Sequence, residues 1–367
     1  MIKLTVSQLE FDKALQGAKS FATGIHAGGN LGELHFTPNG PLTLRSTDLT
    51  HEYVTQISYT GFLDEVLTIT TPIAPLQAYV TKIKDGSLLL EIDKTLLHVK
   101  GTSTRTQSRF GLSDPAGVPQ GFALEEDIPW VAGDTLPFTA LMKHLAFAVE
   151  KPNGNRPVLQ GIMAAVTNGV VEWVATDGSR LARWKGTAGD LPPALFPVKT
   201  IQEIGRWTDL TEYRWSPKIA EFRTPTTTLR VRLLAGQYPD FHRVIPEDFI
   251  ATMHIDTGPL RQALERVMTV MNGREGDPLH WILDKEVVRL VITADQGQSE
   301  EEIPMQQAAG ESPELLFNPR YVWEGLKGLP EDSVCQCQIT GTQSPMRITN
   351  TEVPSWDYIV LPLRQLT

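Results

Sequence analysis

One apolar pattern occurs three times in this chain, at a spacing close to the length of a single domain. It is a triplet with spacings of four and then three residues, which places its members on one face of a helix. Successive copies begin 130 and 119 residues apart: Phe11, Leu15 and Ala18; Leu141, Leu145 and Ala148; Leu260, Leu264 and Val267. A threefold internal repeat restricts the chain to three similar units in tandem.

Two further features keep nearly the same period. A strand-like run that ends in aspartate occurs at 42–48, 171–177 and 288–295, and a proline precedes a short apolar helix pattern at Pro72, Pro197 and Pro319. Amphipathic helices and Thr-Asp turns are common, so one such coincidence would carry little weight. Three features in register favour a true repeat.

Each copy alternates strands with two helices, which predicts an α+β fold. The strands alternate apolar and polar residues, as half-buried antiparallel strands do, and the helices would cover one side of them. The predicted helices are 7–22, 72–85, 139–151, 197–209, 257–274 and 317–328. Proline, glycine and acidic residues gather in 113–137 and 246–258, which predicts three domains at 1–127, 128–250 and 251–367.

Charge is distributed unevenly along the chain. The net charge is −10, which by itself argues against nucleic acid as a ligand. The six predicted helices nevertheless hold 13 Lys and Arg against 8 Asp and Glu, a balance of +5, so the remaining residues carry −15. Helix propensity alone does not explain this, because Glu forms helices as well as Lys and is sparse here. The sequence predicts basic helices in an acidic protein.

No catalytic constellation is evident in the sequence. A phosphate-binding loop, a zinc-protease motif and a nucleophile elbow are all missing, and the eight histidines are scattered. Residues 177–180 resemble a catalytic loop less than a tight turn, because aspartates recur at the same place in each copy. Cys335 and Cys337 are predicted to be free thiols in a strand, with no further ligands for a metal. We expect a non-enzymatic binding protein without a cofactor.

Composition is typical of a globular protein, with 41% apolar and 21% charged residues. Nothing in the sequence resembles a transmembrane span. The first six residues alternate like a strand and lack the apolar core of a signal peptide. We therefore expect a cytoplasmic protein without a membrane partner.

Several segments resemble the bacterial sliding clamp family, the β subunit of DNA polymerase III. The most specific are Ala175–Ala182 (Ala-Thr-Asp-Gly-Ser-Arg-Leu-Ala) and Gly236–Pro246 (Gly-Gln-Tyr-Pro-Asp-Phe-His-Arg-Val-Ile-Pro). Weaker matches are Thr47–Leu49, Ser108–Ser113, Asn318–Tyr321 and the C-terminal Tyr358–Arg364. Their order and spacing agree with the family along the whole chain.

The resemblance implies a ring-shaped, head-to-tail homodimer with three clamp domains per chain, helices lining the inner face and antiparallel sheets outside. Such a ring encircles duplex DNA without reading its sequence and raises the processivity of a polymerase by tethering it. The implied partners are the polymerase III α subunit, the clamp-loader δ subunit, and other polymerases and repair proteins that carry a clamp-binding peptide. The implied location is the cytoplasm, in association with the nucleoid.

The family binds partner peptides in a pocket between the second and third domains and the C-terminal tail. An apolar cleft with a few polar anchors suits a short hydrophobic peptide, although the same residues could simply close a domain junction. The positions that match the family's pocket are Leu159, Thr176, Gly178, Arg180, Leu181, Pro239, Arg243, Val244, Pro345, Ile359, Leu361, Pro362, Leu363 and Arg364.

Two further sets of residues follow from the resemblance and from helix position. The dimer contact is expected to join an edge strand near Phe110 and Leu112 with the third domain near Val270 and Met271 of the other subunit. Lys199 matches the family best as a DNA-facing residue, and the rest of that set rests on charge and helix position: Lys82, Lys84, Lys143, Lys151, Arg156, Arg206, Arg261, Arg266, Arg274, Arg320 and Lys327.

The sequence departs from the family at three places. The segment 23–30 lacks the expected basic character, with His26 as the candidate replacement for an arginine. Ser179 replaces an aromatic or imidazole side chain, and Gln365–Thr367 extend the C-terminus. These differences favour a divergent clamp, such as a second copy or a mobile-element version with altered partners. A repeat protein that binds small molecules or glycans, and an unrecognised hydrolase, are the alternatives outside the family.

Overall fold

The structure is a computed structural model. It describes residues 1–22, 32–114, 119, 121–124, 127–167, 169–188, 191–271, 277–284 and 286–363, without the side chains of 187 and 188. The chain forms two compact units, one of residues 1–135 and 207–233 and the other of 136–206 and 234–367. The predicted second repeat is therefore divided between the two units. The domain boundaries near 127 and 250 concern the sequence repeats, and they stay a prediction.

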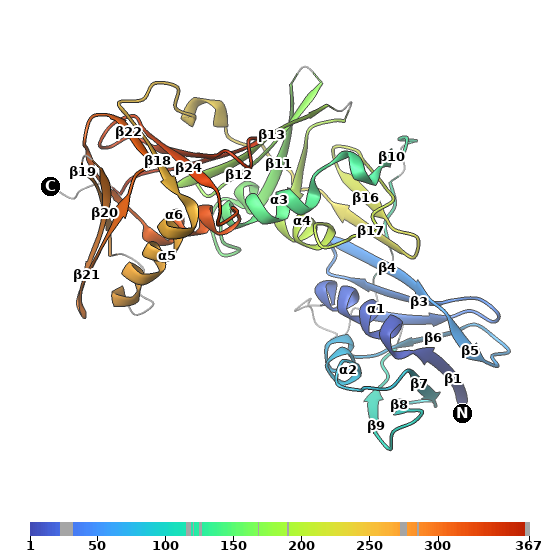
Figure 1. Cartoon of the computed structure of the whole chain (residues 1–367). Coiled ribbons are helices and arrows are strands. Elements are labelled where there is room, and N and C mark those ends of the chain that lie inside the picture. The colour runs from blue at the N-terminus through green and yellow to red at the C-terminus, as the bar shows by residue number, and fades with distance from the viewer. Residues whose placement is uncertain are drawn as a thin grey trace. The chain divides into compact units, whose positions relative to one another are not determined.

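The first unit contains two antiparallel sheets and two α-helices among its described residues (Figure 1). The five-stranded sheet has the order β5 (Tyr59–Gly61), β1 (Ile2–Ser7), β7 (Ser87–Ile92), β8 (Leu96–Gly101) and β9 (Gln107–Gly111). The eight-stranded sheet has the order β10 (Val131–Ala132), β15 (Glu212–Trp215), β16 (Ile219–Arg223), β17 (Thr227–Arg232), β4 (His51–Ile57), β3 (Leu42–Thr47), β2 (Gly32–Phe36) and β6 (Leu67–Thr70). Helix α1 (Gln8–Phe21) packs on β3 and β4 and against α2 (Ile73–Val80).

The second unit repeats this plan. Its nine-stranded sheet has the order β14 (Ala194–Pro197), β11 (Gly161–Thr167), β12 (Val170–Thr176), β13 (Arg180–Ala188), β26 (Trp356–Val360), β25 (Met346–Asn350), β24 (Val334–Ile339), β18 (Ala251–Asp256) and β22 (Gln307–Gly310). Its four-stranded sheet has the order β21 (Gly297–Pro304), β20 (Val287–Ala294), β19 (Leu279–Asp284) and β23 (Glu314–Phe317). The helices are α3 (Phe138–His144), α4 (Val198–Ile204), α5 (Thr257–Val267) and α6 (Pro319–Lys327).

The repeated helix face is the core of each copy, as predicted. All nine side chains of the three apolar triplets are fully buried. The strand-like runs that end in aspartate are β3, β12 and β20, and the three prolines stand at the starts of α2, α4 and α6. The α+β prediction is confirmed.

Four predicted helices were too long, and those expected at 72–85 and 197–209 end at Val80 and Ile204. The helix expected at 257–274 ends at Val267 and continues as a 3₁₀ turn, Met268–Met271, in which the Thr269 hydroxyl donates to the Arg266 carbonyl at 2.7 Å. The β-branched Thr269 and Val270 have low helix propensity there. The helix expected at 139–151 ends at His144, because Leu145 adopts φ −121° before the 3₁₀ turn Ala146–Ala148.

In each unit one sheet joins strands of two successive repeats. We name the pairing of β4 with β17 the first joint and the pairing of β13 with β26 the second joint. Both are continuous antiparallel ladders of five residue pairs. Each joint is therefore built like the interior of a sheet, and its two faces carry different side chains.

Two observations limit the classes of site. No helix in the described part of the chain is long and apolar enough to cross a membrane. Among the same residues, no group of three or more His, Cys, Asp or Glu side chains is placed to hold a metal ion. Cys335 and Cys337 are free and buried in β24, as the sequence predicted.

Candidate functional site

The second joint has an apolar face on the side away from the helices. Leu181 of β13 lies opposite Ile359 of β26, and both pack with Val174 and Phe241 in one buried cluster. The helix side of the same strands carries Trp356 and Tyr358, which lie against α3, the turn after it and α6. Side chains of adjacent strand residues point to opposite faces, so this cluster belongs to the face that the helices leave uncovered.

Three exposed apolar side chains lie close in sequence to members of this cluster, within four residues of Phe241 or Ile359. Val244 is 43% exposed, Leu361 37% and Leu363 40%. The Leu361 amide donates to the Ser179 carbonyl at 2.9 Å, and the Leu363 amide donates to the Leu316 carbonyl at 2.7 Å. These two bonds hold the chain after β26 against the second unit. The result is an apolar surface with a fixed backbone, which is the kind of surface that binds a short apolar peptide.

A tight turn borders the apolar surface. The Asp177 carboxylate accepts the amides of Ser179 at 2.9 Å and Arg180 at 3.1 Å, and the Gly178 amide donates to the Thr176 hydroxyl at 3.0 Å. Gly178 has φ +84°, a conformation that glycine adopts without strain. The structural interpretation of residues 177–180 as a turn is confirmed.

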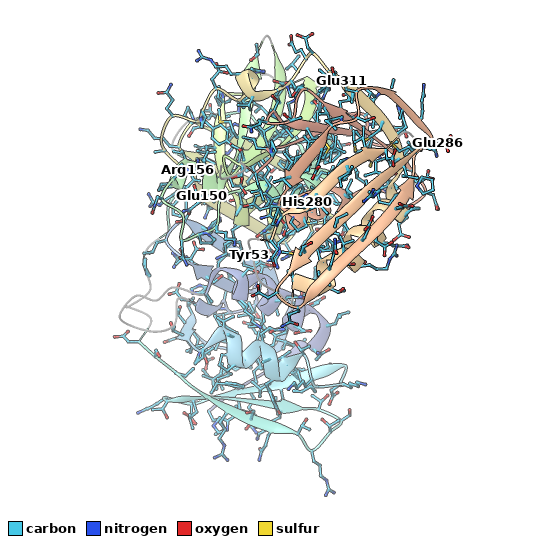
Figure 2. All side chains as sticks on the ribbon, turned by 90° about the vertical axis from the view of Figure 1, so that its left-hand side faces the viewer. Tyr53, Glu150, Arg156, His280, Glu286 and Glu311 are labelled. Atoms are coloured by element: carbon cyan, nitrogen blue, oxygen red, sulfur yellow. The ribbon has the colours of Figure 1, made fainter. Side chains whose placement is uncertain are left out.

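Arg156 lies on this turn. Its guanidinium donates to the Asp177 carbonyl, lies against Gly178, and is paired with Glu150 at 3.3 Å (Figure 2). A side chain at 178 would occupy the space that the guanidinium fills. Arg156 was predicted as a DNA-facing residue, and the structure places it beside the apolar surface with its side chain 52% exposed.

Arg180 connects the turn with the helix side of the sheet. Its guanidinium pairs with Asp177 at 2.9 Å and with Glu324 of α6, donates to the Phe147 carbonyl at 2.7 Å, and lies 4.2 Å from the ring centre of Tyr321. Burial by itself would lower the pKa of Arg180, but the neighbouring Tyr358, Glu324 and Asp177 raise it. Arg180 is therefore a buried cation that fixes the turn rather than an exposed anchor.

The remaining predicted pocket residues have these positions. Leu159 is buried in the 3₁₀ turn Pro157–Gln160. Pro239 and Arg243 are exposed, and Arg243 pairs with Asp240 at 2.9 Å. Pro345 directly precedes β25, where Met346 lies opposite Val360. Pro362 is half-buried between the two exposed leucines, and Arg364 lies outside the described residues.

Sequence reasoning missed five residues of the apolar cluster. They are Val174, Phe241 and the partly buried Ala165, Tyr238 and Ile245. Burial raises the pKa of the Tyr238 hydroxyl. Phe241 and Tyr238 lie inside the segment 236–246 that carried the resemblance. Strand alternation could have identified Val174, because it lies two residues before Thr176 in β12.

The predicted DNA-facing residues differ in exposure and pairing. Lys199 is half-buried, Arg274 lies outside the described residues, Arg261 pairs with Glu331, and Arg266 pairs with Glu301 at 2.7 Å. The exposed members of the set, apart from Arg156 and the paired Arg266, are Lys82, Lys84, Lys143, Lys151, Arg206, Arg320 and Lys327.

The predicted dimer residues are buried or half-buried within their own units. Phe110 is 9% exposed in β9 and Met271 is 7% exposed. Leu112 and Val270 are half-buried.

Comparison with known proteins identifies the family. The model for the central domain of the DNA polymerase III beta subunit matches residues 134–240, and the model for its C-terminal domain matches 242–364. The chain belongs to the DNA polymerase III beta-subunit family. Together the two matches cover more than half of the chain, including the whole candidate site except residue 241.

Individual relatives agree over the full length. The beta sliding clamp of Caulobacter vibrioides is 26% identical over 382 residues, which cover 99% of this chain and 100% of that protein. A DNA polymerase III beta subunit from Thermotoga maritima has a similar fold, with a TM-score of 0.86 and 23% identity, covering 99% of this chain and 100% of the other. A sliding clamp from Bartonella birtlesii, solved bound to griselimycin, has a TM-score of 0.84 and 21% identity over 99% and 100% of the two chains.

Membership of this family makes the chain a DNA sliding clamp, a processivity factor and a non-catalytic accessory subunit of DNA polymerase III rather than an enzyme. The predictions of fold and family are confirmed. DNA and a polymerase follow as partners from the same membership.

Proposed function

We propose that two copies of this chain close into a ring around duplex DNA and tether a polymerase through the apolar surface at the second joint. The observation that carries the proposal is the buried pair Leu181 and Ile359 with the exposed Val244, Leu361 and Leu363 beside it. A binding protein needs such a surface, since contiguous exposed apolar side chains are costly in water without a partner. Catalysis has no part in this mechanism.

The exposed cations on or next to the helices support the DNA-binding part of the proposal. Lys and Arg side chains attract phosphates without reading bases, so the bound protein can move along the duplex. A ring holds DNA by topology, and each contact can then be weak. The acidic remainder of the chain would repel DNA from the other surfaces.

The order of strands supports a head-to-tail homodimer. In the first repeat β2, β3 and β4 are successive strands of one sheet, and β4 pairs with β17, the last strand of the second repeat. In the second repeat β11, β12 and β13 are successive strands, and β13 pairs with β26, the last strand of the third repeat. In the third repeat the corresponding strand is β21, and it lies at the edge of its sheet. The strand in the first repeat that corresponds to β17 and β26 is β9, which is also an edge strand. We infer that β21 of one copy pairs with β9 of the other.

Charges on the two edge strands are complementary. Strand β21 carries Glu300, Glu301 and Glu302, whereas β9 carries Arg109 and follows Arg105. An arginine also pairs with a carboxylate across each internal joint, as Arg230 does with Glu52 at 2.8 Å. The turn Met268–Met271 packs against β20 and β21, which brings Val270 and Met271 next to the proposed contact with Phe110 and Leu112.

The finer partner assignments belong to this proposal. They are the polymerase III α subunit, the clamp-loader δ subunit, and other polymerases and repair proteins with a clamp-binding peptide. A cytoplasmic, nucleoid-associated location would follow from the encirclement of DNA. The segment 23–31 and the residues after Leu363, where the sequence departs from the family, lie outside the described residues, whereas Ser179 is exposed in the turn of the candidate site.

Topology provides the test of the ring. After loading by a clamp loader, the protein should stay on a closed circular duplex and be lost when that duplex is cut to a linear form. Equal retention on the two forms would contradict encirclement. A β9 variant, Arg109→Glu, should shift the dimer to monomer in sedimentation velocity, and pairing with Glu300→Arg should restore part of the dimer.

The tethering surface needs a separate test. Leu361→Ala with Leu363→Ala removes two exposed apolar side chains and substitutes no buried residue. Stimulation of the polymerase should therefore fall at least tenfold while the dimer persists. Val170→Ala is the matched control, because Val170 is also 43% exposed but lies on the β12 hairpin away from the surface. Unchanged stimulation by the double variant would refute the assignment.

A further inference from the structure

A cleft of about 420 Å³ opens on the helix side of the second unit, where α3, α4 and α6 meet. It is distinct from the apolar surface at the second joint, which lies on the opposite face of the sheet. A volume of this size is within the range of small-molecule sites and could hold a group as large as one nucleotide.

Three cations stand around the cleft. Lys143 belongs to α3, Arg206 follows α4, and Lys327 ends α6. Lys143 and Lys327 are exposed, and the Arg206 side chain is 65% exposed with only a distant pairing to Glu203 at 3.8 Å. Glu324 is the one carboxylate in the described lining, and Arg180 already neutralises it. The cleft is therefore strongly cationic.

The walls between these cations are apolar and aromatic. Met142, Ala146 and Phe147 line one side, and the indole of Trp323 lines the other. The Trp323 ring is held in place, since its Nε1 donates to Glu265 at 2.9 Å and the Lys327 ammonium lies 5.2 Å from its centre. Gln202 adds an amide that can donate and accept. Cations beside a fixed aromatic ring are the combination that binds an unstacked base together with its phosphate.

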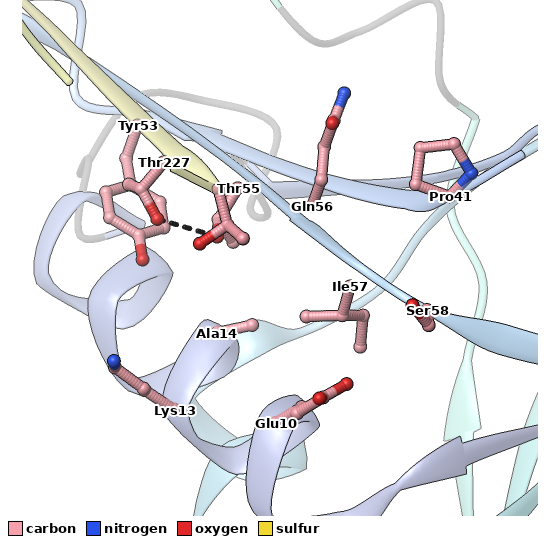
Figure 3. A pocket seen from close by; sticks show the side chains of 11 residues that line it. Glu10, Lys13, Ala14, Pro41, Tyr53, Thr55, Gln56, Ile57, Ser58 and Thr227 are labelled. Atoms are coloured by element: carbon pink, nitrogen blue, oxygen red, sulfur yellow. Dashed lines mark hydrogen bonds between the residues drawn. The ribbon is translucent and has the colours of Figure 1, made fainter. Parts of the chain in front are cut away.

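The first unit offers an internal comparison. A cleft of about 370 Å³ lies there between α1 and β4, next to the hydrogen bond of 2.8 Å between the hydroxyls of Thr55 and Thr227 (Figure 3). Its charged lining residues are Glu10 and Lys13, one of each sign. A cleft of similar volume, lined by other elements, therefore has no net charge in the first unit, whereas the cleft of the second unit has a cationic rim.

We propose that the cleft between α3, α4 and α6 binds one unpaired nucleotide of a DNA strand, with the base against Trp323 and the phosphate between Lys143, Arg206 and Lys327. This rests on the proposed function for the choice of DNA as the anion. A duplex offers phosphates but no free base, so a single-stranded or frayed end is the preferred ligand. The cleft would slow the ring where the duplex ends, without sequence preference.

The test compares three fluorescent probes in anisotropy titrations with the full chain at low salt. They are the decamer of thymidylate, an abasic decamer with the same phosphates, and a blunt duplex of ten base pairs. The thymidylate strand should bind at least fivefold more tightly than the abasic strand, because the base contributes. Trp323→Ala should remove this difference, and Trp323→Phe, which keeps a ring, should retain most of it.

Charge variants separate the cleft from a general cationic surface. Lys327→Ala should weaken thymidylate binding three- to tenfold and lower the slope of log affinity against log salt by about one. Lys94→Ala removes an exposed cation from the turn between β7 and β8, outside the predicted DNA-facing set, and should leave thymidylate binding unchanged. Equal binding of the abasic strand, equal effects of the two lysine variants, or displacement of the strand by hexaglutamate at the same concentration would each overturn the proposal.

Retention on circular DNA distinguishes this proposal from the function on which it rests. Trp323→Ala should still be retained on the closed circle, because encirclement does not need the cleft. If the unaltered protein is not retained, the ring is wrong whatever the strand does. If it is retained but binds thymidylate no better than the abasic strand, only the cleft assignment is wrong.

Discussion

The two joints share one backbone plan and differ in the side chains on their outer faces. Counting from the aspartate of the turn, Glu52 and Arg230 in the first joint occupy the positions that Leu181 and Ile359 occupy in the second. At the next pair on the same face, two residues further from the turn, the order is reversed, with Val54 and Thr228 in the first joint and Arg183 and Asp357 in the second. An ion pair next to the turn leaves no apolar surface there, so only the second joint can offer one.

The first joint is covered by a ladder of alternating charges. Glu52 accepts from Arg45 at 2.7 Å and Arg230 at 2.8 Å, and Glu221 accepts from Arg230 at 2.8 Å and Arg214 at 2.6 Å. Two residues between the first and second repeats, Pro119 and Trp130, lie on this ladder. Arg45 donates to the Pro119 carbonyl, and the Arg214 guanidinium lies 4.3 Å from the ring centre of Trp130. The outer face of the first joint is therefore occupied by the chain itself.

The largest expected effect comes from breaking this ladder. The Glu52 side chain is 3% exposed, so Glu52→Gln would leave two arginines without their shared counter-charge. The free energy of unfolding of the first unit should fall by about 3–5 kcal/mol. Urea denaturation measures this loss of free energy. Amide hydrogen exchange of β4 and β17 shows whether the loss is local to the first joint.

A transplant provides the control. Glu52→Leu with Arg230→Ile gives the first joint the apolar pair of the second. It should cost clearly less than Glu52→Gln, because the remaining charges stay balanced, Arg45 with Glu33 and Arg214 with Glu221. A loss below about 0.5 kcal/mol for Glu52→Gln would show that the ladder is only a set of surface pairs.

The apolar pair of the second joint should respond to truncation. Ile359 is fully buried, so Ile359→Ala should lower the free energy of unfolding by about 2–4 kcal/mol and also weaken binding of a partner peptide. Leu229→Ala is the control in the first joint, where Leu229 is equally buried in β17. It should cost a similar amount of stability and leave peptide binding unchanged; a matching loss of peptide binding would refute the difference between the joints.

The sequence was informative where a period or a motif carried the signal. Helical spacing identified Phe11, Leu15 and Ala18 as core, and the resemblance identified Leu181 and Ile359. Neither could identify the partner of Glu52, because Arg230 is 178 residues away and its pairing depends on the register between repeats. Arg156 was assigned to the DNA side on charge and helix position, whereas its place in the structure depends on the space above Gly178, a property of the folded turn.

Mild acid should weaken the second joint selectively. His144 ends α3 and lies against Trp184 at 5.6 Å and Trp356 at 6.3 Å between ring centres, and burial, with a smaller effect of Lys143, lowers its pKa from 6.5 to about 4. The unfolded chain takes up this proton below pH 6.5, whereas the folded chain resists it until about pH 4. Stability is therefore complete above pH 6.5 and falls as the pH drops towards 4.

Between pH 7.5 and pH 5 this amounts to about 1–2 kcal/mol, allowing for partial exposure to solvent. Urea denaturation at the two pH values measures it. His144→Gln should flatten the dependence in that interval, since carboxylates titrate mainly below it. The residue 130 positions earlier is Ala14 in α1, so the first joint has no counterpart. An unchanged pH dependence in His144→Gln would assign the effect to another group.

The smallest expected effects distinguish the two turns. The turn of the first joint repeats the bonds of the second, with the Leu49 amide donating to the Thr47 hydroxyl at 3.0 Å and the His51 amide to the Asp48 carboxylate at 2.7 Å. Leu49 has φ +72° where the second turn has Gly178 at φ +84°. A left-handed conformation costs a branched side chain about 1–2 kcal/mol, and glycine avoids that cost but gains freedom in the unfolded chain.

Leu49→Gly should therefore raise the free energy of unfolding by about 0.5 kcal/mol. Gly178→Ala should lower it by about 1 kcal/mol and displace Arg156. Differential scanning calorimetry of both variants measures the contrast, and changes of the same sign would mean that the two turns are not strained alike.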